Sequence, residues 1–231
     1  DLEMAIQNAD LVIEAVPEDL DLKREVLADA EEHADGDAIM ATNTSSLSVT
    51  AIADALDRPK RAVGLHFFNP VHVMALVEVV VAEQTDAETQ SFAREFVEGI
   101  DKTPIEVRDV PGFASSRLGV ALGAEAMRMV QERVADPRDV DRAMELGYNH
   151  PMGPIELGDV VGLDVRLDIL EYLREELGER FRPPQVLKRK VRAGNLGKKT
   201  GEGFYVWEDG EIVGVSGRNG EGAANGGGDR P

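Results

Sequence analysis

Residues 1–110 alternate short apolar runs with segments whose apolar residues recur at helical spacing, and this alternation constrains the fold more than any other feature. The apolar runs stop at turn-forming residues such as Pro17 and Asn69-Pro70, as strands do. Strands that alternate with helices predict an α/β domain built on a mostly parallel sheet. The predicted strands are residues 11–16, 38–42, 62–67, 76–82 and 104–107; the predicted helices are 19–33, 48–56 and one that a capping box at 85–88 opens and that runs through Ile100.

After Pro111-Gly112 the pattern becomes helical, so we expect a domain boundary between Val110 and Gly112. Helical spacing of apolar residues and helix-start signals predict four helices, and Asp209-Gly210 between two apolar runs predicts a hairpin. The Gly- and Asn-rich end from Ser216 has nothing to bury and is expected to be disordered. The predicted helices are residues 113–134, one opened by Asp136-Pro137, 163–177 and one after Pro183-Pro184; the predicted domains are 1–110, 111–206 and a hairpin end with tail at 207–231.

Composition excludes several classes of partner. The sequence has 25 basic and 44 acidic residues, a net charge of −19, which repels the phosphates of nucleic acids. With no cysteine and four scattered histidines, we expect no metal site. No apolar run approaches the roughly 18 residues that span a bilayer, and the first residues resemble no targeting segment, so we expect no membrane association and a cytoplasmic protein.

Two titratable residues stand out near the end of the sheet pattern. His66 closes a predicted strand, and open α/β sheets bind ligands beyond the carboxyl ends of their strands. Twelve residues later, Glu78 interrupts an otherwise apolar strand and needs a partner if it is buried. If the two strands pair, Glu78 can orient the imidazole of His66 and stabilise its protonated form. The alternative is a structural histidine, with Glu78 facing solvent from an edge strand; periodicity favours neither.

Several segments together resemble the signature of the 3-hydroxyacyl-CoA dehydrogenase family. They are GLHFFNP at 64–70, MALVEV at 74–79, ADLVIEAVPE at 9–18, TNTSSL at 42–47, PGF at 111–113, PMGP at 151–154 and GKKTGEGFY at 197–205. The match is specific because these motifs occur in order over residues 9–206. The resemblance implies an incomplete Rossmann-type doubly wound sheet followed by an all-helical C-terminal domain, and NAD-dependent oxidation of L-3-hydroxyacyl-CoA to 3-ketoacyl-CoA.

The resemblance also assigns roles to individual residues. His66 would remove the proton of the 3-hydroxyl group, and Glu78 would orient His66. Ser45 and Asn69 would hydrogen-bond the reacting oxygen, the histidine or the nicotinamide amide. The family pattern places further contacts to NAD at Glu18, Lys23 and Lys199, with Lys23 also near the CoA phosphates, and a homodimer through the helical domain.

This sequence departs from the family pattern in two places. Ser116 stands where the family usually has an asparagine that contacts substrate, and serine has a shorter reach. No G-x-G-x-x-G occurs near the start, so we interpret the chain as an N-terminally truncated fragment that is inactive alone. The alternatives are a 3-hydroxybutyryl-CoA or sugar-acid dehydrogenase of the same fold, or a non-catalytic acyl-CoA-binding relative.

Overall fold

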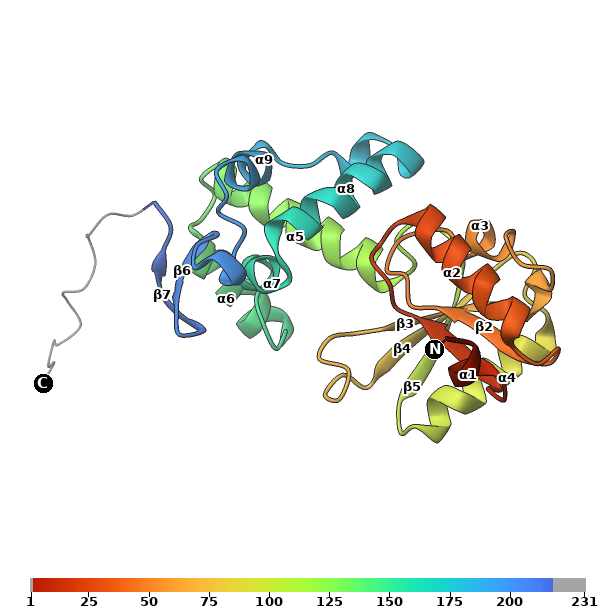
Figure 1. Ribbon diagram of the computed structural model, residues 1–231. Coiled ribbons are helices and arrows are strands. Elements are labelled where there is room, and N and C mark those ends of the chain that lie inside the picture. Colours follow the sequence, from red (N-terminus) through yellow and green to blue (C-terminus); the bar gives the residue numbers. More distant parts are fainter. Residues whose placement is uncertain (1, 218–231) are drawn as a thin grey trace, which may run out of the picture. The chain divides into compact units, whose positions relative to one another are not determined.

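The structure is a computed structural model that describes residues 2–217 (Figure 1). The chain divides into two compact units, residues 1–117 and 118–231, and each is described by itself. The segment from residue 218 onward, most of the tail expected to be disordered, lies outside the described residues. None of the helices in residues 2–217 has the length and hydrophobicity that spanning a membrane requires.

The first unit is built on a five-stranded sheet with the strands in chain order, β1-β2-β3-β4-β5. The pairs β1–β2, β2–β3 and β4–β5 are parallel, and β3–β4 is antiparallel. The predicted α/β class with a mostly parallel sheet is therefore confirmed. The strands are β1 Leu11–Glu14, β2 Ile39–Thr42, β3 Ala62–Phe67, β4 Leu76–Val81 and β5 Thr103–Arg108.

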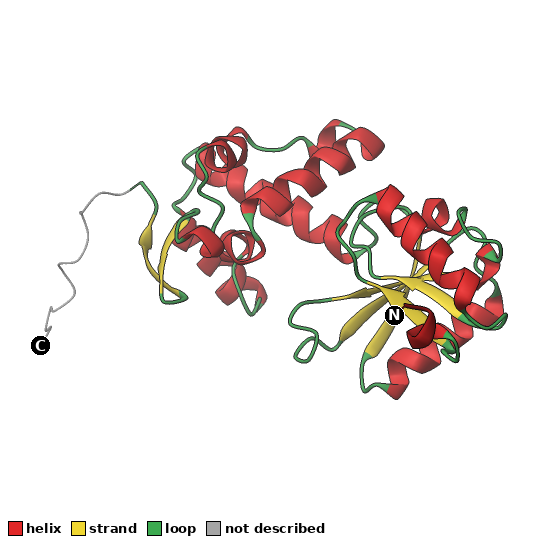
Figure 2. Ribbon diagram, in the orientation of Figure 1, coloured by secondary structure: helices red, strands yellow, loops and turns green. Residues whose placement is uncertain are grey.

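Helices cover both faces of this sheet (Figure 2). Alternation along β2 explains how: Met40 packs with α2 and α3 in one apolar cluster, whereas its neighbours Ile39 and Ala41 pack with α4 in another. Covering both faces makes β2 and β3 almost continuously apolar, as expected for buried strands. The helices are α1 Leu2–Ile6, α2 Leu20–His33, α3 Val49–Ala53 and α4 Ala87–Gly99, with a short 3-10 turn at Pro59–Arg61.

Side-chain caps fix where the helices begin. Asp19 accepts the backbone N–H of Leu22 at the start of α2, the helix predicted over residues 19–33. The expected capping box at 85–88 is wrong in its cap, because Asp86 accepts the N–H of Thr89. Thr85 instead donates its hydroxyl to the carbonyl of Ala62, tying the loop before α4 to the start of β3.

The second unit is helical and closes with a hairpin. One large apolar cluster, which includes Leu170, Phe204 and Trp207, forms its core. The helix at 154–161 is additional to the four predicted. The sequence analysis missed it because the two prolines of the PMGP segment at 151–154 suit a turn, but Pro154 is the first residue of the helix. The elements are α5 Ser115–Gln131, which begins in the first unit, α6 Pro137–Tyr148, α7 Pro154–Val161, α8 Leu163–Leu177, α9 Gln185–Arg192, β6 Tyr205–Glu208 and β7 Glu211–Val215.

Candidate functional site

His66 and Glu78 lie directly opposite each other in the antiparallel pair β3–β4. Their side chains alternate with those of Leu65, Val77 and Val79, which point into the apolar cluster beneath α4. The His66 Nδ1 atom lies 2.7 Å from Glu78 Oε2, and the Glu78 side chain is 0% exposed. Because β5 pairs with β4, the strand of Glu78 is not an edge. The alternative in which Glu78 faces solvent is therefore wrong.

The Glu78 carboxylate accepts three further hydrogen bonds from the turn before α5. Oε1 accepts the N–H groups of Ala114 and Ser115 at 3.2 and 2.9 Å, and Oε2 accepts the Ser115 hydroxyl at 2.8 Å. Burial alone would raise the pKa of Glu78, but the hydrogen bonds from His66 and Ser115 outweigh it and lower that pKa. Glu78 is therefore an ionised acceptor at neutral pH, which leaves Nδ1 of His66 as the donor.

The second imidazole nitrogen of His66 is available for chemistry. Nε2 makes no hydrogen bond to a described residue and is not among the fully buried unpaired atoms. The rings of Phe68 and Phe113 flank the imidazole, with centroids 4.4 and 6.0 Å away. These rings restrict the orientation of the imidazole, and the proton on Nδ1 makes Nε2 the acceptor. Nε2 can therefore accept a proton from a bound molecule.

Two predicted site residues follow the carboxyl ends of the neighbouring strands. Ser45 follows β2, and Asn69 follows β3 at the cis peptide bond to Pro70. Within residues 2–217, neither the Ser45 hydroxyl nor the Asn69 side-chain amide makes a hydrogen bond, so both are available to a ligand. Asn43, which sequence reasoning did not single out, accepts the N–H of Phe67 at 2.9 Å and joins the β2 and β3 ends.

Glu18 holds the loop that contains Ser45. Its Oε1 accepts the N–H groups of Ser45 and Ser46 at 2.9 and 3.0 Å and the Thr44 hydroxyl at 2.6 Å. Burial would raise the pKa of Glu18, but these hydrogen bonds and the nearby Lys23 lower it. From the other side, the Ser116 hydroxyl donates to the carbonyl of Ser45 at 3.3 Å. Glu18 and Ser116 therefore both position Ser45 in this structure.

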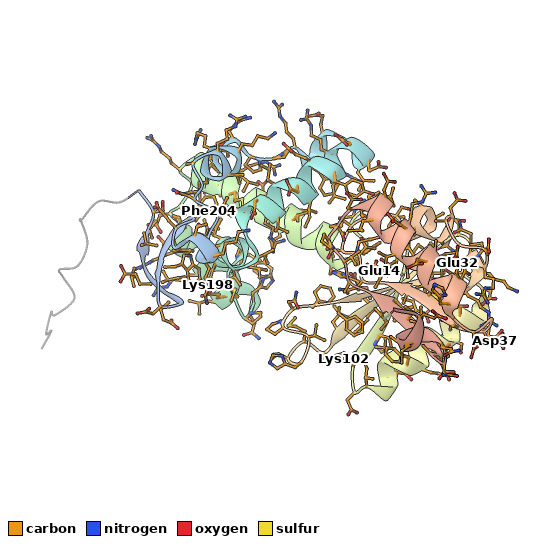
Figure 3. All side chains as sticks on the ribbon, in the orientation of Figure 1. Glu14, Glu32, Asp37, Lys102, Lys198 and Phe204 are labelled. Atoms are coloured by element: carbon orange, nitrogen blue, oxygen red, sulfur yellow. The ribbon has the colours of Figure 1, made fainter. Side chains whose placement is uncertain are left out.

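Lys23 is buried rather than solvated, with 1% of its side chain exposed. Its ammonium contacts both carboxylate oxygens of Glu14 at 3.1 Å, the carbonyl of Val16 at 3.0 Å and Glu18 at 3.5 Å. Glu14, labelled in Figure 3, is the last residue of β1 and also accepts the Thr42 hydroxyl. The ammonium thus ties the end of β1 to α2, and its donors are engaged by the protein.

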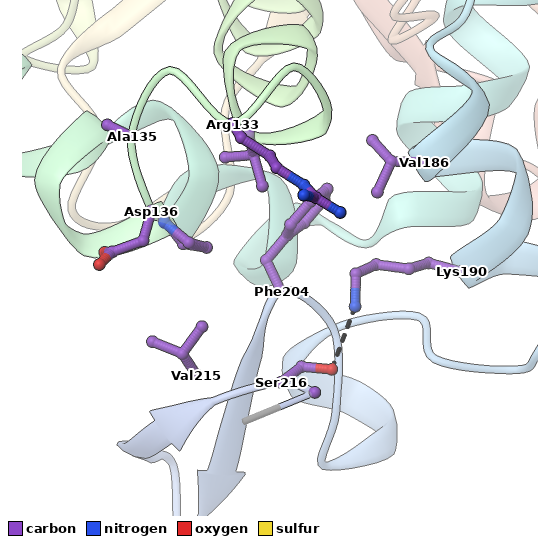
Figure 4. A pocket seen from close by; sticks show the side chains of 11 residues that line it. Arg133, Ala135, Asp136, Val186, Lys190, Phe204, Val215 and Ser216 are labelled. Carbon is purple, nitrogen blue, oxygen red and sulfur yellow. Dashed lines mark hydrogen bonds between the residues drawn. The ribbon is translucent and has the colours of Figure 1, made fainter. Parts of the chain in front are cut away.

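The remaining predicted contact, Lys199, lies in the second unit. Its ammonium pairs with Asp164 at 2.6 Å, and its role toward a cofactor stays a prediction. This unit also has a pocket of about 500 Å³, drawn in Figure 4, where Lys190 donates to the Ser216 hydroxyl at 3.1 Å and to the carbonyl of Gly203 at 2.6 Å. None of the predicted site residues lines this pocket.

Comparison with known proteins shows the family. The model of the 3-hydroxyacyl-CoA dehydrogenase NAD binding domain matches residues 1–110, and that of the C-terminal domain matches residues 112–207. The chain therefore belongs to the 3-hydroxyacyl-CoA dehydrogenase family, and NAD is the cofactor of the domain that residues 1–110 represent.

Individual relatives are similar in sequence to this chain over most of its length. A 3-hydroxybutyryl-CoA dehydrogenase of Clostridioides difficile is 43% identical over 201 residues, 87% of this chain and 72% of the relative. The human mitochondrial hydroxyacyl-coenzyme A dehydrogenase is 41% identical over 210 residues, 90% and 67% of the two chains. The crystal structure of (S)-3-hydroxybutyryl-CoA dehydrogenase from Ralstonia eutropha superposes with a TM-score of 0.87 at 38% identity, covering 90% and 74%.

The described residues fit one part of an NAD site. The free hydroxyl of Ser45 and amide of Asn69 follow adjacent parallel strands and suit the amide and ribose hydroxyls of a nicotinamide riboside. Binding of the pyrophosphate needs a glycine-rich turn that opens a helix at the sheet. Residues 2–217 contain no G-x-G-x-x-G turn, so they do not supply that contact.

Proposed function

We propose that this chain contains the catalytic pair of an L-3-hydroxyacyl-CoA dehydrogenase, with His66 as the base and Glu78 as the group that orients it. The single observation that supports this most is the 2.7 Å contact between His66 Nδ1 and the buried Glu78, which leaves Nε2 free. The family shown for residues 1–110 and 112–207 gives the pair its reaction.

The chemistry divides between substrate, protein and cofactor. His66 Nε2 accepts the proton of the 3-hydroxyl group while C3 of the substrate loses a hydride, so the alcohol becomes a ketone. NAD, when bound, is the acceptor of that hydride. Glu78 stays ionised, holds Nδ1 protonated and stabilises the imidazolium that forms. Ser45 and Asn69 would hydrogen-bond the substrate oxygen and the nicotinamide amide.

The test uses the protein encoded by the longest open reading frame that contains these residues. NADH oxidation with acetoacetyl-CoA measures the reverse reaction, and we expect His66→Ala to lower kcat by about 10²–10⁴-fold with little change in KM. His72→Ala is the matched control, because His72 is exposed on the loop between β3 and β4. Full turnover by His66→Ala would contradict the assignment of His66 as the catalytic base. If the unmodified protein bound acyl-CoA but showed no turnover, the alternative of a non-catalytic acyl-CoA-binding protein would be favoured.

We propose a short acyl chain as the preferred substrate. Relatives that are 43 to 45% identical have 3-hydroxybutyryl-CoA dehydrogenase in their names, whereas the mammalian hydroxyacyl-coenzyme A dehydrogenases are 40 to 42% identical. We expect kcat/KM for acetoacetyl-CoA to exceed that for 3-ketopalmitoyl-CoA, and the reverse order would contradict the proposal. The predicted contacts of Glu18 and Lys199 with NAD belong to the proposal for the catalytic pair, whereas the ammonium of Lys23 is engaged by Glu14, Val16 and Glu18.

We also propose that a polypeptide of residues 1–231 alone binds NAD weakly and turns over little substrate. The phosphates of a dinucleotide are normally held by backbone N–H groups at a helix start that follows a glycine-rich turn, and residues 2–217 contain no such turn. Isothermal titration of this polypeptide with NAD checks the expectation. Micromolar binding would refute it.

A homodimer through the helical unit is the remaining part of the proposal. Leu118 on α5 is 72% exposed, and apolar residues on α5, α7 and α8 are also exposed. Sedimentation velocity should show a dimer that Leu118→Asp dissociates, whereas Leu146→Asp, at an 83% exposed leucine of α6, should leave it intact. A monomeric unmodified protein would refute the dimer. The other exposed members are Leu122, Leu157, Val160, Val161 and Val165.

A further inference from the structure

Besides His66, the Glu78 carboxylate has a side-chain partner, the hydroxyl of Ser115. The two N–H groups that Oε1 accepts come from the backbone, so any residue except proline at positions 114 and 115 would supply them. The hydrogen bond to Oε2 at 2.8 Å is different, because it depends on the hydroxyl of Ser115. Oε2 is also the atom that His66 Nδ1 contacts at 2.7 Å, so the hydroxyl and the imidazole share one oxygen.

We propose that Ser115 is a positioning residue of the His66–Glu78 pair, whose hydroxyl fixes Glu78 Oε2 and draws part of its negative charge away from His66. The inference rests on the proposed function for its catalytic meaning, although the contacts themselves do not. Ser115 is the first residue of α5, so the position of this helix start sets where the hydroxyl and the two N–H groups meet the carboxylate.

Electrostatics gives the direction of the effect. Each hydrogen bond to a carboxylate oxygen stabilises its charge and lowers its basicity. A less basic Oε2 attracts the imidazolium of His66 less strongly, so removal of the Ser115 hydroxyl is expected to strengthen that attraction. His66 is the titratable side chain hydrogen-bonded to Glu78, and the other donors, Ala114 and Ser115, are uncharged. Around His66, the contacting rings of Phe68 and Phe113 are also uncharged.

The charge effect comes with an orienting effect. The Ser115 hydroxyl and the N–H groups of Ala114 and Ser115 hold both oxygens from the α5 side, while His66 contacts Oε2 from β3. The carboxylate plane is therefore fixed by groups on two different elements. Without the hydroxyl, Oε2 keeps only its bond to His66, and the carboxylate gains freedom to rotate about its remaining contacts.

The test compares Ser115→Thr with Ser115→Val, which have nearly the same shape and differ in the hydroxyl. The midpoint of the His66 titration is measured by NMR on the imidazole nitrogens of the 231-residue chain, with the signal identified by its loss in His66→Gln. We expect Ser115→Thr to titrate like the unmodified chain and Ser115→Val to titrate about half to one pH unit higher. Coincident titrations of the Thr and Val variants, within about 0.2 unit, would overturn the proposal.

Two further measurements keep the outcome decisive. If Ser115→Val does not fold by circular dichroism, Ser115→Ala replaces it, with the same expected shift. In the protein encoded by the longest open reading frame, the acid limb of kcat/KM for hydroxyacyl-CoA oxidation should move to higher pH in Ser115→Val and return in Ser115→Thr. An inactive His66→Ala with unshifted Ser115 variants would refute this inference alone, whereas an active His66→Ala would refute the proposed function.

Discussion

The carboxylate of Asp159 offers the sharpest test of what holds the second unit together. Asp159 is 0% exposed, and its oxygens accept the N–H groups of Phe204 and Tyr205 at 2.9 Å and the Trp207 indole N–H at 3.0 Å. It therefore joins α7 to the start of the hairpin. Gly203 packs so closely that an added Cβ would lie 2.2 Å from Asp159 Oδ1, which leaves no room for rearrangement.

The substitution Asp159→Ala would leave three buried donors without an acceptor. Each costs about 1–3 kcal/mol when unpaired, so the gross loss is on the order of 3–9 kcal/mol. Burial raises the pKa of Asp159, which means that its ionised form is itself costly in the folded state. Removing that cost, and water entering the vacated space, offset part of the loss, so we expect the free energy of unfolding to fall by about 3 kcal/mol or more.

Urea denaturation followed by fluorescence measures this change. Trp207 is the only tryptophan of the sequence and is itself a partner of Asp159, so the signal reports on the affected site. Asp168→Ala is the control, because Asp168 is exposed on α8 and should change the free energy of unfolding by no more than about 0.5 kcal/mol. If Asp159→Ala lost less than about 1 kcal/mol, the reasoning from unpaired donors would be refuted.

Three further predictions concern other buried groups. In Gly64→Ala, the new Cβ would lie 2.7 Å from Val80 Cβ and 2.9 Å from Val49 Cγ2, so thermal unfolding should show a loss of about 1–3 kcal/mol; an unchanged Tm would contradict this. Arg166 is buried with an unpaired Nε and burial lowers its pKa, so Arg166→Leu should be neutral or stabilising by up to about 4 kcal/mol in urea, and a clear destabilisation would show that the cation has a partner. The folded state lowers the pKa of Glu78, so its ionised carboxylate stabilises the protein at pH values above 4.5, the ordinary glutamate value, and this stabilisation is lost as the pH falls through the folded pKa. The difference in unfolding free energy between the unmodified protein and Glu78→Gln should therefore become smaller in acid. A difference that does not change with pH would contradict this contribution.

Local patterns were sufficient to predict most elements of the fold. The β2 and β3 strands and the α2 helix follow from apolar runs, turn residues and helical spacing that lie within a few residues of one another, and such signals do not depend on the rest of the chain. The helix at Pro154–Val161 was missed because it has only eight residues and opens with a proline, which also suits a turn. Short elements gain most of their stability from tertiary packing, which spacing does not report.

The candidate site was likewise predictable only in the part that depends on local sequence. The sequence predicted that His66 lies at a strand end and that Glu78 lies in an apolar strand, and the motifs around them indicated the family. The role of Ser115 was not readable, because its bond to Glu78 joins residues 37 apart in the chain. Nor could the sequence show that Lys23, which the family pattern places at NAD, is buried against Glu14 at the end of β1.

The sequence by itself determined the alternating strands and helices, the family and the candidate pair, because these depend on local periodicity and on motifs in order. The tertiary structure decided which groups meet. It placed β4 between β3 and β5, brought the start of α5 to Glu78 and set Ser45 between Glu18 and Ser116. A hydrogen bond requires two groups within about 3 Å, and only the packing of distant elements brings them that close.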